Sequence, residues 1–562
     1  MMFERLNKNK VEVFLLALAI LPHIPIALSN PNTILDWYSS DDGFYYFQVA
    51  RNLAEGHGFT FDRINETNGF HPLWLFLITP IFAFAQVDKL IPLRALILFS
   101  AIISGASAIL FYRILRGYAS NGIAMLAGIA WIVVPRIHDI AMHAGVEAGI
   151  NALTLLLYWH DLVHYIEGFQ KRKRGDLVRL GFLGVLAILA RLDNVFIVGM
   201  GSLWLLLNLD RAERASKPKL QWTFRLKSWL VYLAPIGIGM LIYLAWNILD
   251  FETAIPVSGQ VKAWWGTLRN TVYGFPVRHL AAFWGQFFTD DPELGPWSLA
   301  TSQLYRGADL ILNFAGLGLS TAARRVALVA LGILTVGLAA IIAWGNRGFF
   351  KRANKELALF PLFSACFAQI SYYKISGSVA QQPWYWIGEI IFILFSFCLF
   401  LEGIILFLRK RYPQPARWLG TSAIAGLVVA ITFSFAGFIQ SAIRLPGDGS
   451  NHYYYHRPAW LEQQTEPEAR IAITGAGNLG YFIEGRTIIN LDGLINSYDY
   501  FLALRNGRGA DFLMSAGVDY IFGNEYILTE TNPYEPVLEG HLQPYEAYVF
   551  GDRELKLWRF VP

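Results

Sequence analysis

Long runs of apolar residues alternate with short clusters of Lys and Arg along this chain, and this alternation constrains the fold more than any other feature. A helix needs about 20 apolar residues to cross a bilayer, and Lys and Arg collect in cytoplasmic loops. With 55% hydrophobic residues, 16% charged residues and a mean hydropathy of +0.39, the chain is too apolar for a soluble enzyme of its length. We therefore expect an integral membrane protein. We attribute the net charge of +4 to topology and not to nucleic-acid binding.

The basic clusters predict the topology. They lie at residues 5–10, 113–116, 171–179, 211–227, 347–355 and 409–417. If every cluster faces the cytoplasm, each interval between two clusters contains an even number of crossings. Length and parity together predict about eleven transmembrane helices, two of them within a single apolar stretch. Their ranges are 11–28, 94–112, 121–137, 148–167, 181–209 (the pair), 228–249, 326–345, 356–372, 386–408 and 418–439.

This odd number of spans places the N-terminus in the cytoplasm and the residues after 442 outside. The run 11–28 lacks a small-residue cleavage site, so we interpret it as an uncleaved first span and not as a signal peptide. The apolar stretch 72–85 is short and contains Pro80, which predicts a juxtamembrane helix at the interface. Residues 29–93 then form one large outer loop.

The apolar stretch 181–209 is too long for one comfortable span and too short for two full ones. Arg191 and Asp193 interrupt it, and a charge at mid-bilayer costs about 2.5–3.5 kcal/mol on insertion scales. A hairpin of two short helices with residues 190–194 at its outer tip satisfies both length and parity. Such short helices imply a cavity that dips into the membrane from outside.

The composition changes near residue 443, which divides the chain into a membrane domain (1–442) and an extracytoplasmic domain (443–562). In the second domain the pattern predicts strands at 470–474, 487–491 and 518–522 and a helix at 498–516, hence a small α/β fold. Gly475, Gly477 and Gly480 have the spacing of a dinucleotide fingerprint. The long helix and the suitably placed acid that the fingerprint requires do not follow, so we expect these glycines only to shape a turn.

Two adjacent carboxylates, Asp41 and Asp42, lie in the large outer loop. Paired acids just outside a bilayer suit chemistry on a substrate whose hydrophobic part stays in the lipid. The alternative is that Ser40 and the two acids only cap a helix that starts at Gly43. A cap needs one such residue, so the pair favours a functional role.

Several motifs together resemble the GT-C superfamily of membrane glycosyltransferases, over residues 1–270 and more loosely over 320–440. They are Asp41-Asp42 before an amphipathic helix, Glu55-Gly-His-Gly-Phe59, Thr67-Asn-Gly-Phe-His-Pro-Leu-Trp74, Ala144-Gly-Val-Glu147 and Ala190-Arg-Leu-Asp193. The pattern is most similar to the bacterial branch with protein mannosyltransferase-like and arabinofuranosyltransferase-like enzymes. The resemblance places the chain in a bacterial cytoplasmic membrane.

This resemblance implies that a hexosyl or pentosyl group moves from a polyprenyl-phosphate carrier to an extracytoplasmic glycan, lipid or protein acceptor. Inverting displacement at the anomeric carbon needs a base for the acceptor hydroxyl and cations for the leaving phosphate. In the family the first acid of the pair is generally the base, which assigns that role to Asp41. Asp42 then orients Asp41 or the acceptor.

Seven further residues are candidates for substrate binding: Glu147, Arg191, Lys262, His71, His143, Lys374 and Trp384. Glu147 and His71 match polar positions of the family. Arg191, then Lys262 and Lys374, are the cations that we expect near the leaving phosphate, because an Arg offers two parallel donors to a phosphate.

Ordinary structural roles stay open for these candidates. Glu147 could be a first-turn charge on the following helix, and Arg191 could pair with Asp193. The two lysines could extend to lipid headgroups, and Trp384 could belong to an interfacial aromatic belt.

No cofactor is expected to be required. Cys366 and Cys398 lie in apolar runs and provide no metal-ligand spacing. Asp41, Asp42 and Glu147 could still hold a divalent cation through oxygen ligands. Two other functional classes also remain open, a polytopic transporter and an envelope-assembly protein without transferase activity.

Overall fold

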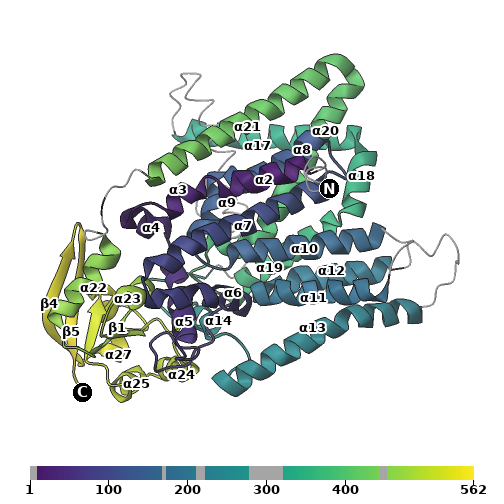
Figure 1. The fold of residues 1–562 in the computed structure, drawn as a ribbon. Helices are drawn as coiled ribbons and strands as arrows, with labels where there is room; N and C mark the ends of the chain where they lie inside the picture. Colours follow the sequence, from purple (N-terminus) through teal and green to yellow (C-terminus); the bar gives the residue numbers. More distant parts are fainter. Residues whose placement is uncertain (1–8, 168–172, 210–221, 277–320, 444–446, 448–451) are drawn as a thin grey trace.

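The computed structural model describes residues 9–167, 173–209, 222–276, 321–443, 447 and 452–562, most of which are helical (Figure 1). The first helices are α2 (Lys10–Ile20), α3 (His23–Ala27), α4 (Pro31–Trp37), α5 (Asp41–Ala54), α6 (Pro72–Phe82), η1 (Ala83–Gln86), α7 (Leu90–Leu115), α8 (Asn121–Val133), α9 (Pro135–His138), η2 (Asp139–His143) and α10 (Ala148–Glu167). They are followed by α11 (Arg174–Ala190), η4 (Leu192–Asn194), α12 (Val195–Asn208), α13 (Trp222–Phe251), α14 (Val257–Trp265), α17 (Thr321–Gly345), α18 (Arg347–Glu356), α19 (Leu359–Ser376), η6 (Pro383–Trp386), α20 (Ile387–Arg411) and α21 (Pro413–Ile443).

Within these residues, five helices are long and apolar enough to cross a membrane, or seven if each of two bent pairs forms one span. The chain is thus a multi-pass membrane protein, but the predicted number of eleven spans is not confirmed. Helices α11 and α12 have only 17 and 14 residues, so apolar run length overestimates the number of full crossings. The basic clusters at residues 5–10 and 211–227 lie largely outside the described residues.

The predicted break within residues 181–209 is confirmed. Helix α11 ends at Ala190 and α12 begins at Val195, with Arg191 and the short turn η4 between them. Asn194 fixes this turn, because its side-chain amide donates to the Ala187 carbonyl oxygen at 2.7 Å and to Asn151 Oδ1 at 2.6 Å. The hairpin tip therefore has a defined geometry.

The large loop between α3 and α7 folds into the short helices α4, α5 and α6 followed by η1. The predicted helix at residues 72–85 is present as α6 and η1, and its location at the membrane surface stays a prediction. Helix α5 packs against α6 on one side and against α23 of the C-terminal part on the other.

The C-terminal part is an α/β unit. Its elements are α22 (Tyr453–Gln464), β1 (Arg470–Ile473), α23 (Gly477–Phe482), β2 (Thr487–Asn490), α24 (Tyr498–Arg505), α25 (Gly509–Ser515), β3 (Tyr520–Gly523), α26 (Glu525–Glu530), α27 (Glu535–Leu538), β4 (Leu542–Phe550) and β5 (Arg553–Phe560). The sheet order is β2-β1-β3-β5-β4, in which β1 pairs in parallel with β2 and β3, and β5 pairs antiparallel with β3 and β4.

The three predicted strands are therefore present, and the sequence pattern missed β4 and β5. The prediction of a single helix over residues 498–516 is wrong. The structure has two helices there, α24 and α25, separated at Gly507, whose φ of 70° is a left-handed conformation that favours glycine.

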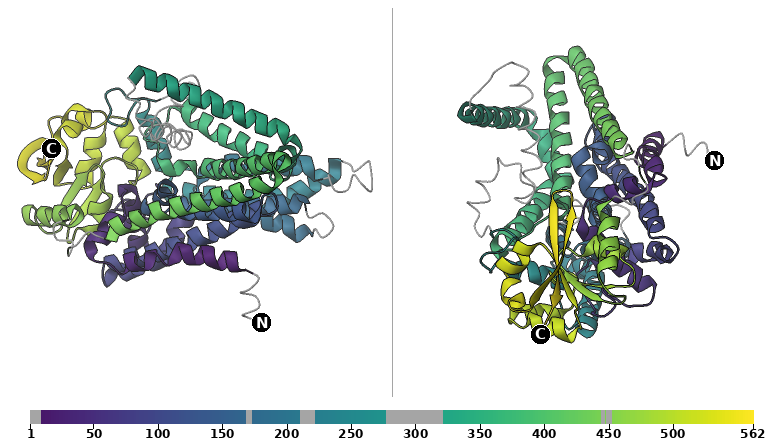
Figure 2. Two further views of the ribbon diagram at one scale, coloured as in Figure 1. Left: turned by 90° about the horizontal axis from the view of Figure 1, so that it is seen from above. Right: turned by 90° about the vertical axis from the view of Figure 1, so that its left-hand side faces the viewer.

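The α/β unit lies against one end of the helical part, and α2 begins toward the other end (Figures 1 and 2). One hydrophobic core runs through both parts and joins Phe44 and Phe47 of α5 to Tyr481 and Phe482 of α23. The ring centroids of Phe44 and Phe482 are 5.6 Å apart. The outer loop and the sheet unit are therefore packed as one body around the first turn of α5.

Candidate functional site

The first turn of α5 carries the two adjacent acids. Ser40 caps this helix, because its side-chain oxygen accepts the backbone N–H of Asp42 at 3.2 Å. The capping role that the sequence left open for the acids is thus filled by Ser40. Both carboxylates are available for other contacts.

The two acids point to different parts of the molecule. Asp41 lies against the C-terminal unit, where its carboxylate accepts the backbone N–H groups of Gly477 at 2.9 Å and Asn478 at 2.8 Å. The side-chain amide of Asn478 adds a third donor at 2.5 Å. Asp42 is partly exposed and lies on the wall of a cavity. Within the described part of the chain, the Asp42 carboxylate has no recorded hydrogen bond.

The cavity has a volume of about 550 Å³, which is in the range of small-ligand sites. The first outer loop, the hairpin tip, α14, the end of α19 and η6 line it, and residues 494 and 495 of the C-terminal unit complete the wall. Six of the predicted site residues are on the wall: Asp42, His71, Glu147, Arg191, Lys262 and Trp384. Asp41, His143 and Lys374 are not among the lining residues.

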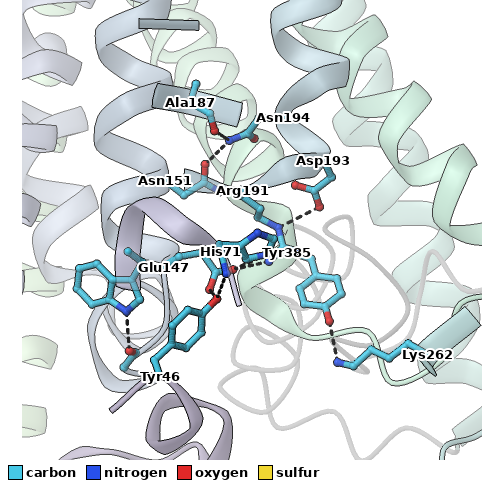
Figure 3. A network of polar contacts seen from close by, with 12 residues as sticks. Tyr46, His71, Glu147, Asn151, Ala187, Arg191, Asp193, Asn194, Lys262 and Tyr385 are labelled. Atoms are coloured by element: carbon cyan, nitrogen blue, oxygen red, sulfur yellow. Dashed lines mark hydrogen bonds and ion pairs between the residues drawn. The ribbon is translucent and has the colours of Figure 1, made fainter. Parts of the chain in front are cut away.

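Glu147 is the centre of a buried polar network (Figure 3). Arg191 Nη1 lies 2.5 Å from Glu147 Oε1, Tyr46 donates its hydroxyl to Oε2 at 2.9 Å, and His71 Nε2 lies 3.7 Å from Oε1. Burial raises the pKa of Glu147, whereas His71 and Arg191 lower it. The lowering is the larger effect, so the net pKa of Glu147 is below its usual value. Glu147 is thus held as a carboxylate and is more than a first-turn charge of α10.

Arg191 joins the hairpin tip to the opposite wall. Its Nε lies 2.9 Å from Asp193 Oδ2, so the predicted alternative pairing is present together with the Glu147 contact. Its guanidinium also lies 4.0 Å from the ring centroid of Tyr385. The single positive charge of Arg191 therefore lies between two carboxylates.

Lys262 provides a different kind of cation. It lies on α14, and its Nζ donates to the Tyr385 hydroxyl at 2.7 Å (Figure 3). The same Nζ also donates to the Ala380 carbonyl oxygen at 3.2 Å. Both of these partners are neutral, so in contrast to Arg191 the positive charge is not balanced by a bonded carboxylate.

Asp42 has an electrostatic environment that suits a proton acceptor. Burial raises the pKa of Asp42, and Lys262 lowers it by attraction, while Asp41 and Glu147 raise it by repulsion. The net pKa is above the ordinary value of an aspartate, which brings it closer to neutrality.

Two further candidates, His143 and Lys374, do not line the cavity and are packed against other residues. His143 is buried, and its ring lies 3.9 Å from that of Trp37. Lys374 is buried near the end of α19 and donates to Gln381 Oε1 at 3.3 Å. Their predicted contact with substrate has no support from the cavity geometry.

The sequence interpretation missed the tyrosines of the site. Tyr46 holds Glu147, while Tyr373 and Tyr385 contact Asp193 and Lys262 respectively. Tyr46 follows Asp42 by four residues, so the two share one face of α5, and this spacing was a signal in the sequence. Tyr385 belonged to an aromatic cluster that the sequence could not distinguish from an interfacial belt.

Among the described residues, no three His, Cys, Asp or Glu side chains come together as a candidate metal site. Asp41, which could have helped to hold a cation with Asp42 and Glu147, is bound to backbone and side-chain donors of the C-terminal unit. Independence from cofactors, and the use of a divalent cation, both stay predictions.

Comparisons with known proteins address the fold. Residues 448–558 match a family described as a domain of unknown function, DUF8728. No curated protein sequence matches the chain. Among solved structures, the oligosaccharyltransferase AglB of Archaeoglobus fulgidus is similar with a TM-score of 0.51 and 14% identity, over 97% of this chain and 74% of that chain.

Two further structures are similar over nearly the whole chain. ArnT of Cupriavidus metallidurans has a TM-score of 0.42 and 13% identity, over 97% of both chains. The arabinofuranosyltransferase AftD from Mycobacteria has a TM-score of 0.39 and 13% identity, over 97% of this chain and 41% of that chain. The likeness to AglB shows that this chain has the GT-C fold, as the sequence predicts.

Proposed function

We propose that this protein is a membrane glycosyltransferase that transfers a sugar from a polyprenyl-phosphate carrier to an acceptor hydroxyl. One observation carries the proposal. Asp42, the Glu147–Arg191 pair and Lys262 line a single cavity of about 550 Å³ in a chain with the GT-C fold. Displacement of a phosphate requires a base and a cation, and the cavity offers a carboxylate with a raised pKa and a lysine whose hydrogen-bond partners are neutral.

Asp42 is the base in this proposal. It removes the proton from the acceptor hydroxyl, whose oxygen then attacks the anomeric carbon of the donor from the face opposite the phosphate. The bond between the anomeric carbon and the phosphate oxygen breaks, and its electron pair leaves with the polyprenyl phosphate. The sugar is transferred with inversion. The assignment moves from Asp41 to Asp42, because the Asp41 carboxylate already accepts three N–H donors away from the cavity.

Lys262 is the principal cation for the leaving phosphate. Arg191, the first choice from sequence, is flanked by Glu147 and Asp193, so an approaching phosphate meets two negative charges beside it. Lys262 has neutral partners, Tyr385 and Ala380, and keeps its charge for the phosphate. Arg191 instead holds Glu147 and the hairpin tip in place. Trp384, also on the wall, offers a ring for apolar contact with a sugar face.

The proposed carrier agrees with the ligand of a structural relative. The AglB structure contains a dolichol-phosphate and an inhibitory peptide. For this chain we propose a polyprenyl-phosphate hexose or pentose as donor and a glycan, lipid or protein as acceptor. We also propose that the N-terminus is cytoplasmic, that the C-terminal unit and the cavity mouth are extracytoplasmic, and that the membrane is the bacterial inner membrane.

Turnover of labelled donors tests this function. The purified protein is reconstituted in lipid nanodiscs and supplied with polyprenyl phosphates that carry a radiolabelled hexose or pentose, together with envelope extract as acceptor. We expect labelled product, or slow release of sugar to water, from the parent protein and a loss of about 10²- to 10⁴-fold in Asp42→Asn. Equal turnover by the two proteins would remove Asp42 as the base. A second reconstitution in sealed vesicles tests the alternative, because movement of intact donor across the membrane without transfer would favour a transporter.

A further inference from the structure

A glycine-containing turn follows β1 at the centre of the parallel part of the sheet. Strand β1 has β2 on one side and β3 on the other, both parallel to it. The chain therefore leaves β1 at a point where the strand order reverses, which is where open α/β sheets usually bind ligands. The turn comprises residues 475–478, and we call it the glycine turn.

In this protein, α5 occupies the place of such a ligand. Gly477 and Asn478 of the glycine turn donate their backbone N–H groups to separate oxygens of the Asp41 carboxylate. A Cβ atom on Gly477 would overlap the backbone carbonyl oxygen of Asp41, so only glycine allows this approach. The glycine turn thus holds a carboxylate of the same chain with the donors that an anionic ligand would use.

A second acid ties α5 to the sheet beside this contact. Asp492 follows β2, and its Oδ2 accepts the backbone N–H of Gly475 at 2.7 Å and the hydroxyl of Tyr45 at 3.3 Å. Its Oδ1 accepts the hydroxyls of Tyr534 at 2.7 Å and Tyr273 at 3.0 Å. Asp492 therefore links the glycine turn, α5 and the segment after α14.

The spacing along α5 directs two pairs of side chains differently. Asp41 and Tyr45 are four residues apart and bond to the C-terminal unit, and Tyr45 also borders the cavity. Asp42 and Tyr46 are also four residues apart and line the cavity. Because the helix is rigid, fixing the first pair sets the direction of the second.

We propose that the glycine turn and Asp492 form a clamp on Asp41 and Tyr45 that positions Asp42 in the cavity, so that the C-terminal unit is a positioning element of the transferase site and binds no nucleotide in this turn. This inference rests on the proposed function, because it needs Asp42 to be the base. It assigns a role to the region that matches a family of unknown function. Asp41, Gly477 and Asn478 are positioning residues here, and none of them contacts substrate.

A charge exchange tests the clamp. Asn478→Asp replaces the side-chain donor to Asp41 by a second carboxylate of nearly the same shape. Asp41→Asn alone removes the acceptor charge, and the double variant Asp41→Asn with Asn478→Asp restores a donor and an acceptor in reversed order. Asn506→Asp adds the same charge at an exposed position of the same unit and is the matched control.

Two readouts are measured for each variant: thermal unfolding in nanodiscs, which needs no substrate, and the pH profile of turnover. We expect Asn478→Asp to unfold at lower temperature and to lose about tenfold or more in turnover, with its acidic limb moved to higher pH, because the new carboxylate repels charge on the acid pair. The double variant should recover part of both losses. The control should match the parent in both readouts.

The outcomes separate the clamp from the function on which it rests. Losses in unfolding temperature that simply add in the double variant would overturn the contact between Asn478 and Asp41, whether or not the protein turns over. A recovered unfolding temperature with a parental pH profile in Asn478→Asp would overturn the positioning role. Absence of turnover in the parent protein would overturn the proposed function and the positioning role with it, while the unfolding data would still decide the contact.

Discussion

The first turn of α5 carries a carboxylate on each of two faces, and the two carboxylates differ in their hydrogen bonding. On the face toward the C-terminal unit, the Asp41 carboxylate accepts three N–H donors. On the cavity face, the Asp42 carboxylate accepts no hydrogen bond from the described residues, although burial raises the pKa of both acids. Neighbouring residues on a helix point about 100° apart, so one turn can present both. A satisfied carboxylate holds structure together, and an unsatisfied one beside a cavity is available for proton transfer.

The largest expected effect is at Asp42. Asp42→Asn keeps the size of the side chain and removes its basicity, so we expect turnover to fall by about 10²- to 10⁴-fold with little change in unfolding temperature. Donor turnover in nanodiscs and thermal unfolding measure the two quantities. Retained turnover in Asp42→Asn, together with a complete loss in Asp41→Asn and unchanged stability, would reverse the roles of the two faces.

The next effect concerns the cation on the cavity face. Lys262→Gln removes the charge that we assign to the leaving phosphate and should lower turnover by about 10²-fold or more. Lys262 lowers the pKa of Asp42, so its removal should raise that pKa. Asp42 is then protonated at higher pH, and the acidic limb of the turnover profile should move upward.

Asp41→Asn should move the acidic limb of the turnover profile in the direction opposite to Lys262→Gln, so the two variants are compared. Asp41 raises the pKa of Asp42 by repulsion, so loss of its charge should move the acidic limb to lower pH. Lys262→Arg keeps a positive charge and should leave the limb close to its parental position. If the acidic limb lies at the same pH in Lys262→Gln, Asp41→Asn and the parent, then Asp42 does not govern the acidic side of the turnover profile.

A third prediction concerns the face toward the C-terminal unit. Gly477→Ala places a methyl group against the Asp41 backbone, which must move, and a displacement of about 1 Å at a reacting group can lower turnover about 10²-fold. Gly523→Ala in β3 is the matched control, since the nearest atom to its methyl group would be Leu528 Cδ1 at 3.1 Å, in a side chain and not in the backbone. Parental turnover in Gly477→Ala would show that the cavity face does not depend on this contact.

The smallest effect is expected at Trp384, which lies on the cavity wall without a role in proton transfer or charge. Loss of an aromatic contact with a sugar ring is worth about 1 kcal/mol, so Trp384→Ala should raise KM about fivefold and leave kcat nearly unchanged. Trp384→Phe keeps an aromatic ring, so its KM should lie between those of the parent and Trp384→Ala. A change in kcat alone would place Trp384 with the reacting groups instead.

The part of the fold that follows from local sequence was predictable. Arg191 and Asp193 interrupt an apolar stretch, and the structure breaks the helix there because the charges need polar partners. Apolar patterns with turn residues likewise predicted β1, β2 and β3. The number of spans was not predictable in this way, because a short apolar helix can be buried in protein as well as in lipid.

The separation of the two acids could not be read from sequence either. It depends on a contact between Asp41 and Gly477, which are 436 residues apart, and no local pattern encodes such a pairing. The glycine spacing predicted a turn at residues 475–480 but not its partner. By contrast, Glu147 and Arg191 were both predicted for the site, Glu147 from the resemblance to the family and Arg191 from its place at the tip of the hairpin, and the structure pairs them.

The contact between Asp41 and the glycine turn also sets an order of events during synthesis. The helix that carries both acids is made within the first tenth of the chain, whereas its holding residues lie near the end. A nascent chain therefore has the acids long before it can orient them. The site is completed only after the C-terminal unit has been translated and folded against α5, so a truncated product would keep the acid pair without the arrangement that directs it.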